Sequence, residues 1–166
     1  MQAERQTESP LPAGLEEPIT AYVRGLIAAG YSARTVKASG GDLRQFAAFV
    51  DERGITEIGQ IVRADVTAFA AELAGPREGS KRPYARSTIG RKLSMVRSFL
   101  RFCEDNGLTE VSPGAGVSSP KMPRRLPQVL TPEQMARLLD AIDGPKPLEL
   151  RDRALFELIY SSGLRC

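Results

Sequence analysis

The residues of this 166-residue chain that could do chemistry are mainly arginines and serines. Between Lys81 and Arg101 there are seven basic residues and no acidic residue. The chain has no histidine, which excludes a Ser–His–Asp triad and a histidine general base within it. Its two cysteines, Cys103 and Cys166, do not have a metal-type spacing, so we expect no metal site. Arginine and serine donate hydrogen bonds to phosphate oxygens, so a polyanion is the expected partner.

The overall composition is that of a soluble globular protein. Hydrophobic residues make up 42% of the chain and charged residues 26%, and the formal net charge is only +3. The basic block therefore stands out from a nearly neutral background. No apolar stretch is long enough to span a membrane, and the N-terminal sequence has no apolar core of a signal peptide. We expect a reduced, cytoplasmic protein without membrane contact.

Helical periodicity accounts for most of the first two thirds of the chain, and no segment has a convincing strand pattern. The tail of residues 1–14 contains Pro10, Pro12 and Gly14 and is expected to be disordered. Apolar residues then recur at helical spacing in four segments, and a Gly follows the end of each segment. The expected helices are 15–29, 33–53, 63–74 and 86–106. An all-α fold follows, with one domain over residues 15–107.

The fourth helix has two chemically distinct faces on a helical wheel. Its apolar stripe consists of Ile89, Leu93, Val96, Leu100 and Cys103. The opposite arc is formed by Arg86, Ser87, Arg91, Ser94, Arg97, Ser98 and Arg101. Because this arc has no carboxylate of its own, we expect its arginines to lack a partner within the chain and to bind DNA phosphates.

Two further segments are basic. The polar arc of the second helix contains Arg34, Lys37, Arg44 and Gln45. Residues 108–127 are predicted to be an extended, proline-rich linker, whose basic residues are Lys121, Arg124 and Arg125. Each basic face alone could be merely a soluble surface. Their coincidence in one small domain favours nucleic-acid binding.

A second unit is predicted from residue 128 to 166. The sequence "TPEQ" at residues 131–134 has the pattern of a capping box with Pro at the first helical position. One more helix is expected at about 148–161, followed by Gly163. Two helices cannot bury both of their faces, so we expect several apolar side chains to be under-packed. These are Met135, Leu138, Leu139, Leu155, Phe156 and Ile159.

Four stretches of the sequence together resemble the Xer-type tyrosine recombinases, the XerC/XerD branch of the phage-integrase family. They are "YSARTVKASGGDLRQFAAFV", "ARSTIGRKLSMVRSFLRFCEDNG", "SPGAGVSSPKMPRRLPQVLT" and "RDRALFELIYSSGLR". The first two are amphipathic helices and carry little weight alone. The proline-rich linker followed by the last stretch is the specific part of the resemblance.

The resemblance implies a SAM-like four-helix core-binding domain at 15–107, followed by the first two helices of an incomplete catalytic domain at 128–166. In this family the Gly-Leu-Arg after the second catalytic-domain helix supplies the first catalytic arginine, which corresponds to Arg165. Its guanidinium would hold the scissile phosphate of double-stranded DNA. The family's Lys, His residues and nucleophilic Tyr would follow Arg165. Tyr160 lies in an apolar helix, where we expect core packing instead.

The resemblance further implies a site-specific recombinase that forms a 3′-phosphotyrosyl intermediate and needs no cofactor. This chain is expected to be a fragment that binds DNA without cutting it. In the Xer branch the substrate would be a dif-like site for chromosome-dimer resolution, with a partner recombinase and a controlling translocase. A phage or transposon integrase is the near alternative. A non-catalytic DNA-binding truncation product and a helical protein-interaction module are alternatives of other classes.

Overall fold

The computed structural model describes residues 11–76, 83–118, 129–142 and 144–163. Within these ranges the chain forms six α-helices and one short 3-10 helix, with a single isolated bridge between Gly14 and Glu57 in place of any strand. The expected all-α class is therefore confirmed. The chain divides into two compact units, Met1–Met122 and Pro123–Cys166.

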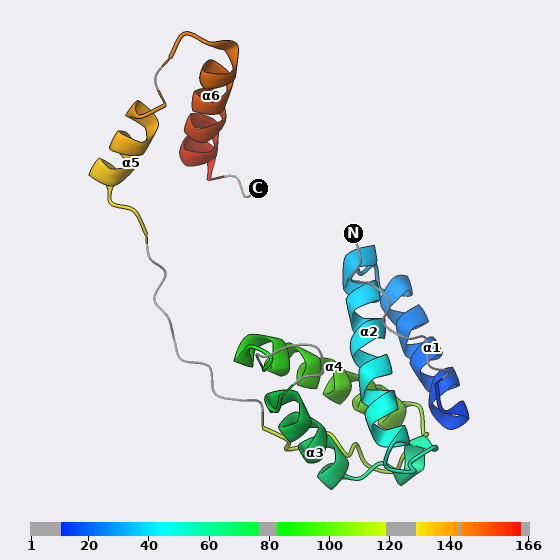
Figure 1. Cartoon of the computed structure of the whole chain (residues 1–166). Helices are drawn as coiled ribbons and strands as arrows, with labels where there is room; N and C mark the ends of the chain where they lie inside the picture. Colours follow the sequence, from blue (N-terminus) through cyan, green and yellow to red (C-terminus); the bar gives the residue numbers. More distant parts are fainter. Residues whose placement is uncertain (1–10, 77–82, 119–128, 143, 164–166) are drawn as a thin grey trace. The chain divides into compact units, whose positions relative to one another are not determined.

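The first unit contains four α-helices, which are labelled in Figure 1. They are α1 (Ala13–Ala28), α2 (Ala33–Asp51), α3 (Arg63–Ala74) and α4 (Arg86–Asp105), with the 3-10 helix at Ile58–Gln60. The expected helices are present, with ends that differ by at most two residues. Helix α1 begins inside the range expected to be a disordered tail, because the carbonyl of Pro12 accepts hydrogen bonds from the amides of Leu15 and Glu16.

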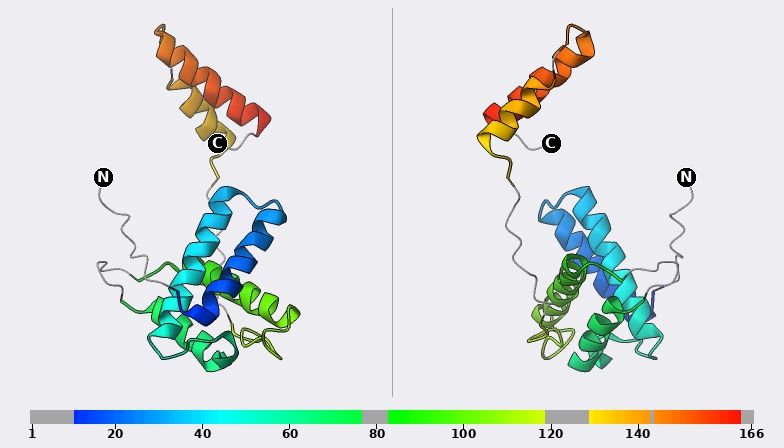
Figure 2. Two further views of the ribbon diagram at one scale, coloured as in Figure 1. Left: turned by 90° about the vertical axis from the view of Figure 1, so that its right-hand side faces the viewer. Right: turned by 60° about the vertical axis from the view of Figure 1, so that its left-hand side comes forward.

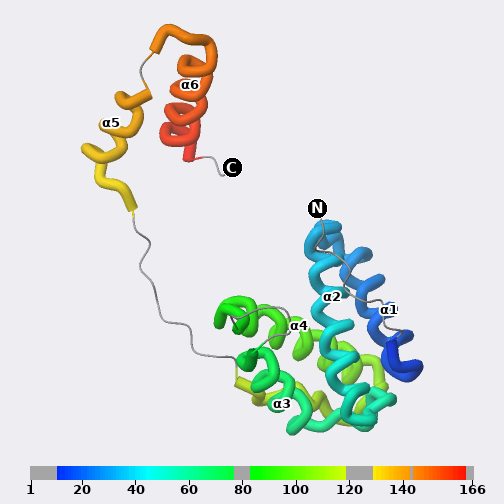
Figure 3. The backbone as a smooth tube through the Cα atoms, viewed as in Figure 1, coloured from blue at the N-terminus to red at the C-terminus, as the bar shows by residue number. Residues whose placement is uncertain are grey.

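Helix α2 is the central element of the first unit. It packs against α1, α3 and α4, and the tube view shows α4 crossing it (Figure 3). Two further views show α1 and α2 lying side by side as an antiparallel pair (Figure 2). The hydroxyl of Ser32 caps α2 by accepting from the amide of Thr35 at 3.2 Å. The helix continues without interruption through Gly40 and Gly41.

The core of the first unit is built from the expected apolar faces. All five residues of the α4 stripe are buried, with Leu93, Val96 and Leu100 fully inaccessible. Aromatic rings pack around it edge to face, which is the favoured geometry for such pairs. The ring centroids are 5.1 Å apart for Phe46 and Phe69 and 5.7 Å apart for Tyr22 and Phe99.

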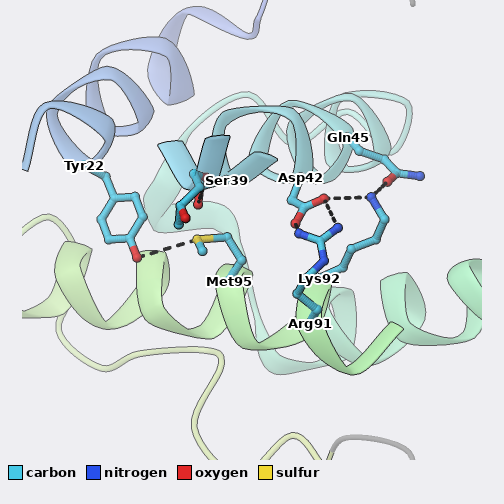
Figure 4. Close-up of polar contacts among 8 residues, drawn as sticks. Tyr22, Ser39, Asp42, Gln45, Arg91, Lys92 and Met95 are labelled. Carbon is cyan, nitrogen blue, oxygen red and sulfur yellow. Dashed lines mark hydrogen bonds and ion pairs between the residues drawn. The ribbon is translucent and has the colours of Figure 1, made fainter. Parts of the chain in front are cut away.

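A buried ionic cluster joins α2 to α4 at their crossing (Figure 4). Asp42 of α2 is only 3% exposed. Its carboxylate accepts from both terminal nitrogens of Arg91 and, at 2.8 Å, from the Nζ of Lys92. Lys92 also donates to Oε1 of Gln45 at 2.7 Å and lies 5.1 Å from the centre of the Tyr84 ring. A carboxylate from another helix thus lies against the basic residues of α4.

The first part of the expected linker belongs to the first unit. Ser112 and Val117 are buried, and Gly114 lies so close to Arg97 that a Cβ there would be 3.2 Å from the Cα of Arg97. Arg97 donates to the carbonyl of Val117 at 2.8 Å, and Arg63 donates to the carbonyl of Gly116 at 2.9 Å. Residues 112–117 are therefore folded against the domain instead of extended, because two arginines satisfy the carbonyls of a turn. Residues 119–128 lie outside the described residues.

The second unit contains α5 (Pro132–Asp140) and α6 (Pro147–Ser162). The capping box is confirmed, since Thr131 and Gln134 exchange amide and side-chain hydrogen bonds of 2.9 and 3.3 Å. Neither helix has a buried residue among those described. The expected under-packing is thus confirmed, with Leu155 and Phe156 about half exposed. The expectation for Tyr160 was wrong in this chain, because its side chain is 55% exposed and packs into no core.

The difference in packing between the two units predicts an order of proteolysis. Cleavage should remove residues 123–166 before it reaches the α1–α4 domain, because local unfolding is easiest where few apolar side chains are buried. Trypsin digestion followed by mass spectrometry would test this. Both units offer exposed arginines, so equal rates of cleavage in the two would contradict the expectation.

Removal of the buried carboxylate should strongly destabilise the first unit. Asp42→Ala leaves the buried Lys92 without its counter-ion, and breaking a buried pair in this way costs about 3–5 kcal/mol of unfolding free energy. Urea denaturation followed by circular dichroism would measure the loss. Asp51→Ala, at an exposed position in the last turn of the same helix, serves as the control. A loss below about 0.5 kcal/mol for Asp42→Ala, the usual size for a surface change, would show that the cluster is unimportant for stability.

Loss of the Arg97 guanidinium should release the 112–117 turn. In Arg97→Ala the carbonyl of Val117 loses its donor, and we expect faster hydrogen exchange at the amides of Ala115 and Val117, which close the turn. Amide exchange followed by NMR would detect this change against unchanged protection in α2. Unaltered exchange at both amides would mean that the turn does not depend on Arg97.

Candidate nucleic-acid interface

The solvent-facing side of α4 has the expected arginine and serine composition. Its apolar stripe is directed into the core, so the opposite arc is turned outward. Among the expected DNA-binding residues on this helix, those classed as exposed are Arg86, Ser87, Arg91, Ser94, Ser98 and Arg101. Exposed side chains with N–H or O–H donors thus lie on the outer side of α4, and such groups donate hydrogen bonds to phosphate oxygens.

Helix α2 adds a second set of exposed cations. Arg34, Lys37 and Arg44 are exposed, on the side of α2 that is not packed into the core. Gln45, on the same helix, differs from them because its side-chain oxygen accepts from Lys92. Since α4 packs directly against α2, the two basic helices belong to one rigid domain.

Arg91 lies where the two helices cross, and its guanidinium points toward Asp42 of α2 (Figure 4). Its side chain is 51% exposed although it forms an ion pair with the buried Asp42. The expectation that the α4 arginines have no partner within the chain was therefore wrong for Arg91. The wheel of α4 could not show the partner, because Asp42 comes from another helix.

Two other residues of the expected arc also have internal roles. Arg97 is half-buried and donates to the carbonyl of Val117. The Oγ of Ser98 accepts from the hydroxyl of Tyr22 at 2.8 Å, although Ser98 is exposed. For Arg97 this internal contact reduces the number of N–H donors that are available to a ligand. Ser98 keeps its own O–H group as a donor.

The other predicted site residues lie outside the described residues. These are Lys121, Arg124 and Arg125 of the linker and Arg165, the expected catalytic arginine. Their assignments stay predictions. Within the described residues, the candidate interface therefore consists of the exposed basic and serine side chains on α2 and α4.

Sequence reasoning missed the buried carboxylate that pairs with this surface. Asp42 is the only acid between Ala33 and Val50, and it directly precedes the buried Leu43. A lone carboxylate at the edge of an apolar stripe was the available signal for a buried ion pair. Lys92 gave a similar signal, since it directly precedes Leu93 and is buried as well.

Other kinds of site receive no support from the described residues. Burial raises the pKa of the Cys103 thiol to about 12, so this cysteine is not a thiolate nucleophile at neutral pH. No group of three or more potential metal-binding side chains occurs in the described parts of the chain. None of the described helices is long and apolar enough to cross a membrane.

Comparison with known proteins places the domain. Residues 19–107 match the family described as phage integrase, N-terminal SAM-like domain. The chain is 35% identical over 153 residues to the tyrosine recombinase XerC of Roseiflexus castenholzii, covering 91% of this chain and 47% of that protein. It is 34% identical over 141 residues to the tyrosine recombinase XerD of Listeria monocytogenes, covering 84% of this chain and 46% of that protein. The chain thus spans about half the length of these relatives.

A solved structure supports the fold. The integrase from mycobacterium phage Brujita matches 92% of this chain and 47% of its own chain, with a TM-score of 0.56 and 20% sequence identity. The match over residues 19–107 shows that the chain belongs to the phage-integrase family of tyrosine recombinases and contains the family's N-terminal SAM-like domain.

Proposed function

We propose that the first unit is the core-binding half of a site-specific DNA recombinase and binds double-stranded DNA through α2 and α4. One observation carries the proposal: exposed arginines and serines lie on the outer side of α4, and α2, which packs against α4, has exposed cations as well. Arginine contacts phosphates through paired N–H groups and can also read guanine edges in the major groove. The relatives that are tyrosine recombinases support the same assignment.

The proposed DNA-binding residues fall into two groups. The exposed set consists of Arg34, Lys37, Arg44, Arg86, Ser87, Arg91, Ser94, Ser98 and Arg101. Lys121, Arg124 and Arg125 would add contacts from the linker. We exclude Arg97 from the direct contacts, because its guanidinium holds the 112–117 turn.

For the whole protein we propose recombination through a 3′-phosphotyrosyl intermediate. Such a bond conserves the energy of the phosphodiester, so strand exchange needs no nucleotide hydrolysis. Arg165 would stabilise the negative charge that develops on the scissile phosphate. The chain described here would bind DNA without cleaving it, because the nucleophilic Tyr and the family's Lys and His residues would lie beyond Arg165.

The biological setting is proposed from the Xer relatives. It is chromosome-dimer resolution in the cytoplasm at a dif-like site, during chromosome partition and cell division. A second recombinase and a DNA translocase would be the partners. A mobile-element integrase is the closest alternative, since the Brujita phage integrase shares the fold. Recombination of a plasmid carrying two dif-like sites, by a chain extended to the full length of its relatives, would separate these alternatives.

Direct titration tests the DNA-binding proposal. We expect the chain to bind a dif-like duplex more tightly than a scrambled one, measured by fluorescence anisotropy at about 50 and about 200 mM salt. Each phosphate neutralised contributes about −0.9 to the slope of log K against log salt, so affinity should fall steeply. Arg101→Ala and Arg44→Ala should each reduce the magnitude of that slope by about 1.

Arg53→Gln is the matched control for charge. Arg53 follows the end of α2 and lies over the ring of Phe49, 4.7 Å from its centre, outside the proposed set. Its loss should leave the slope unchanged. Failure to bind either duplex, or affinity independent of salt, would contradict the proposal and favour a helical protein-interaction module.

A further inference from the structure

Resting on the proposed DNA-binding function, we propose that Asp42 is a positioning residue that fixes the Arg91 guanidinium for contact with a DNA phosphate. Nothing in the sequence pattern of α4 assigns a role to this carboxylate. Asp42 is buried, and both of its oxygens accept from Arg91, with Nη2 3.2 Å from Oδ1. A two-point contact restricts the planar guanidinium far more than a single hydrogen bond does.

The charges of the cluster leave Arg91 available. Lys92 is 8% exposed and its contacts with Asp42, Gln45 and the Tyr84 ring are all internal. Lys92 thus balances the negative charge of Asp42 inside the domain. The cluster of one carboxylate and two cations keeps a net positive charge, and the half-exposed Arg91 presents it to solvent.

Positioning has a physical benefit for binding. A free arginine side chain loses much rotamer freedom when it contacts a phosphate. In the folded domain the contact with Asp42 already restricts the Arg91 side chain, so less freedom is lost on binding. Asp42 accepts from two of the five N–H groups of the guanidinium, and the others stay available to an anion. The buried carboxylate therefore strengthens DNA binding although it carries the wrong charge for DNA.

For Asp42→Asn, positioning and simple electrostatics predict opposite changes in DNA affinity. Asp42→Asn raises the net charge of the domain by one, so charge alone predicts tighter DNA binding. Positioning predicts weaker binding, with Kd increased roughly three- to tenfold. Asp51→Asn is the matched control, because it makes the same substitution at an exposed position of the same helix. Its Kd should be unchanged or slightly lower.

A double-mutant cycle separates positioning from a packing effect. In an Arg91→Ala background, Asp42→Asn should no longer weaken binding, because the residue through which Asp42 acts is absent. Equal weakening in both backgrounds would mean that the substitution disturbs the α2–α4 crossing, and would overturn the proposal. So would unchanged or tighter binding by Asp42→Asn in the otherwise unaltered chain.

Arg91→Lys decides the question if Asp42→Asn does not fold by circular dichroism. Lysine keeps the charge but cannot make the two-point contact. We expect its Kd to approach that of Arg91→Ala, and a Kd equal to that of the unaltered chain would overturn the proposal. All titrations use the full chain and the same duplex. If the unaltered chain itself binds no DNA, the proposed function fails first, and that result is distinct from a failure of positioning.

Discussion

The ion pairs of Asp42 are the interaction on which the first unit depends most. Helix α4 buries Lys92 at the edge of its core stripe, and a buried ammonium is costly unless an acceptor meets it. Asp42 supplies that acceptor from α2. Because the contact is ionic and directional, it also sets how α2 and α4 cross. The exposed cations of both helices are then carried by one packed domain, and we assign them to DNA binding.

The basic residues of α4 have different roles although they lie on one helix. Arg101 and Arg86 are exposed, whereas Arg97 satisfies a carbonyl of the turn that follows the helix. Arg91 combines the two properties, because its guanidinium pairs with Asp42 while its side chain stays half exposed. A count of positive charges would treat these residues as equivalent. Because their contacts differ, we expect substitutions of these arginines to affect folding to different extents.

The two units illustrate different sources of helix stability. Helices α5 and α6 have good local signals, including a capping box at Thr131 and a left-handed Gly163 after the last turn. Local signals are sufficient to define the helices, yet neither helix buries a described residue. Helices α1 to α4 are different, since each buries an apolar face against its neighbours. Most of the stability of a helix in a protein comes from such packing.

The sequence by itself determined the helices, their apolar faces and the family. Periodicity and terminal glycines predicted α3 and its neighbours, because both are local properties of the chain. The exposed arginines of α4 were also predictable, since burial of the stripe that contains Leu93 requires the opposite arc to face solvent. Only the tertiary structure decided what each polar side chain contacts. The partnership of Asp42 with Arg91, and the folding of the 112–117 turn onto Arg97 and Arg63, join segments that are separated in sequence. No local pattern records which surfaces meet, because that depends on how the helices cross.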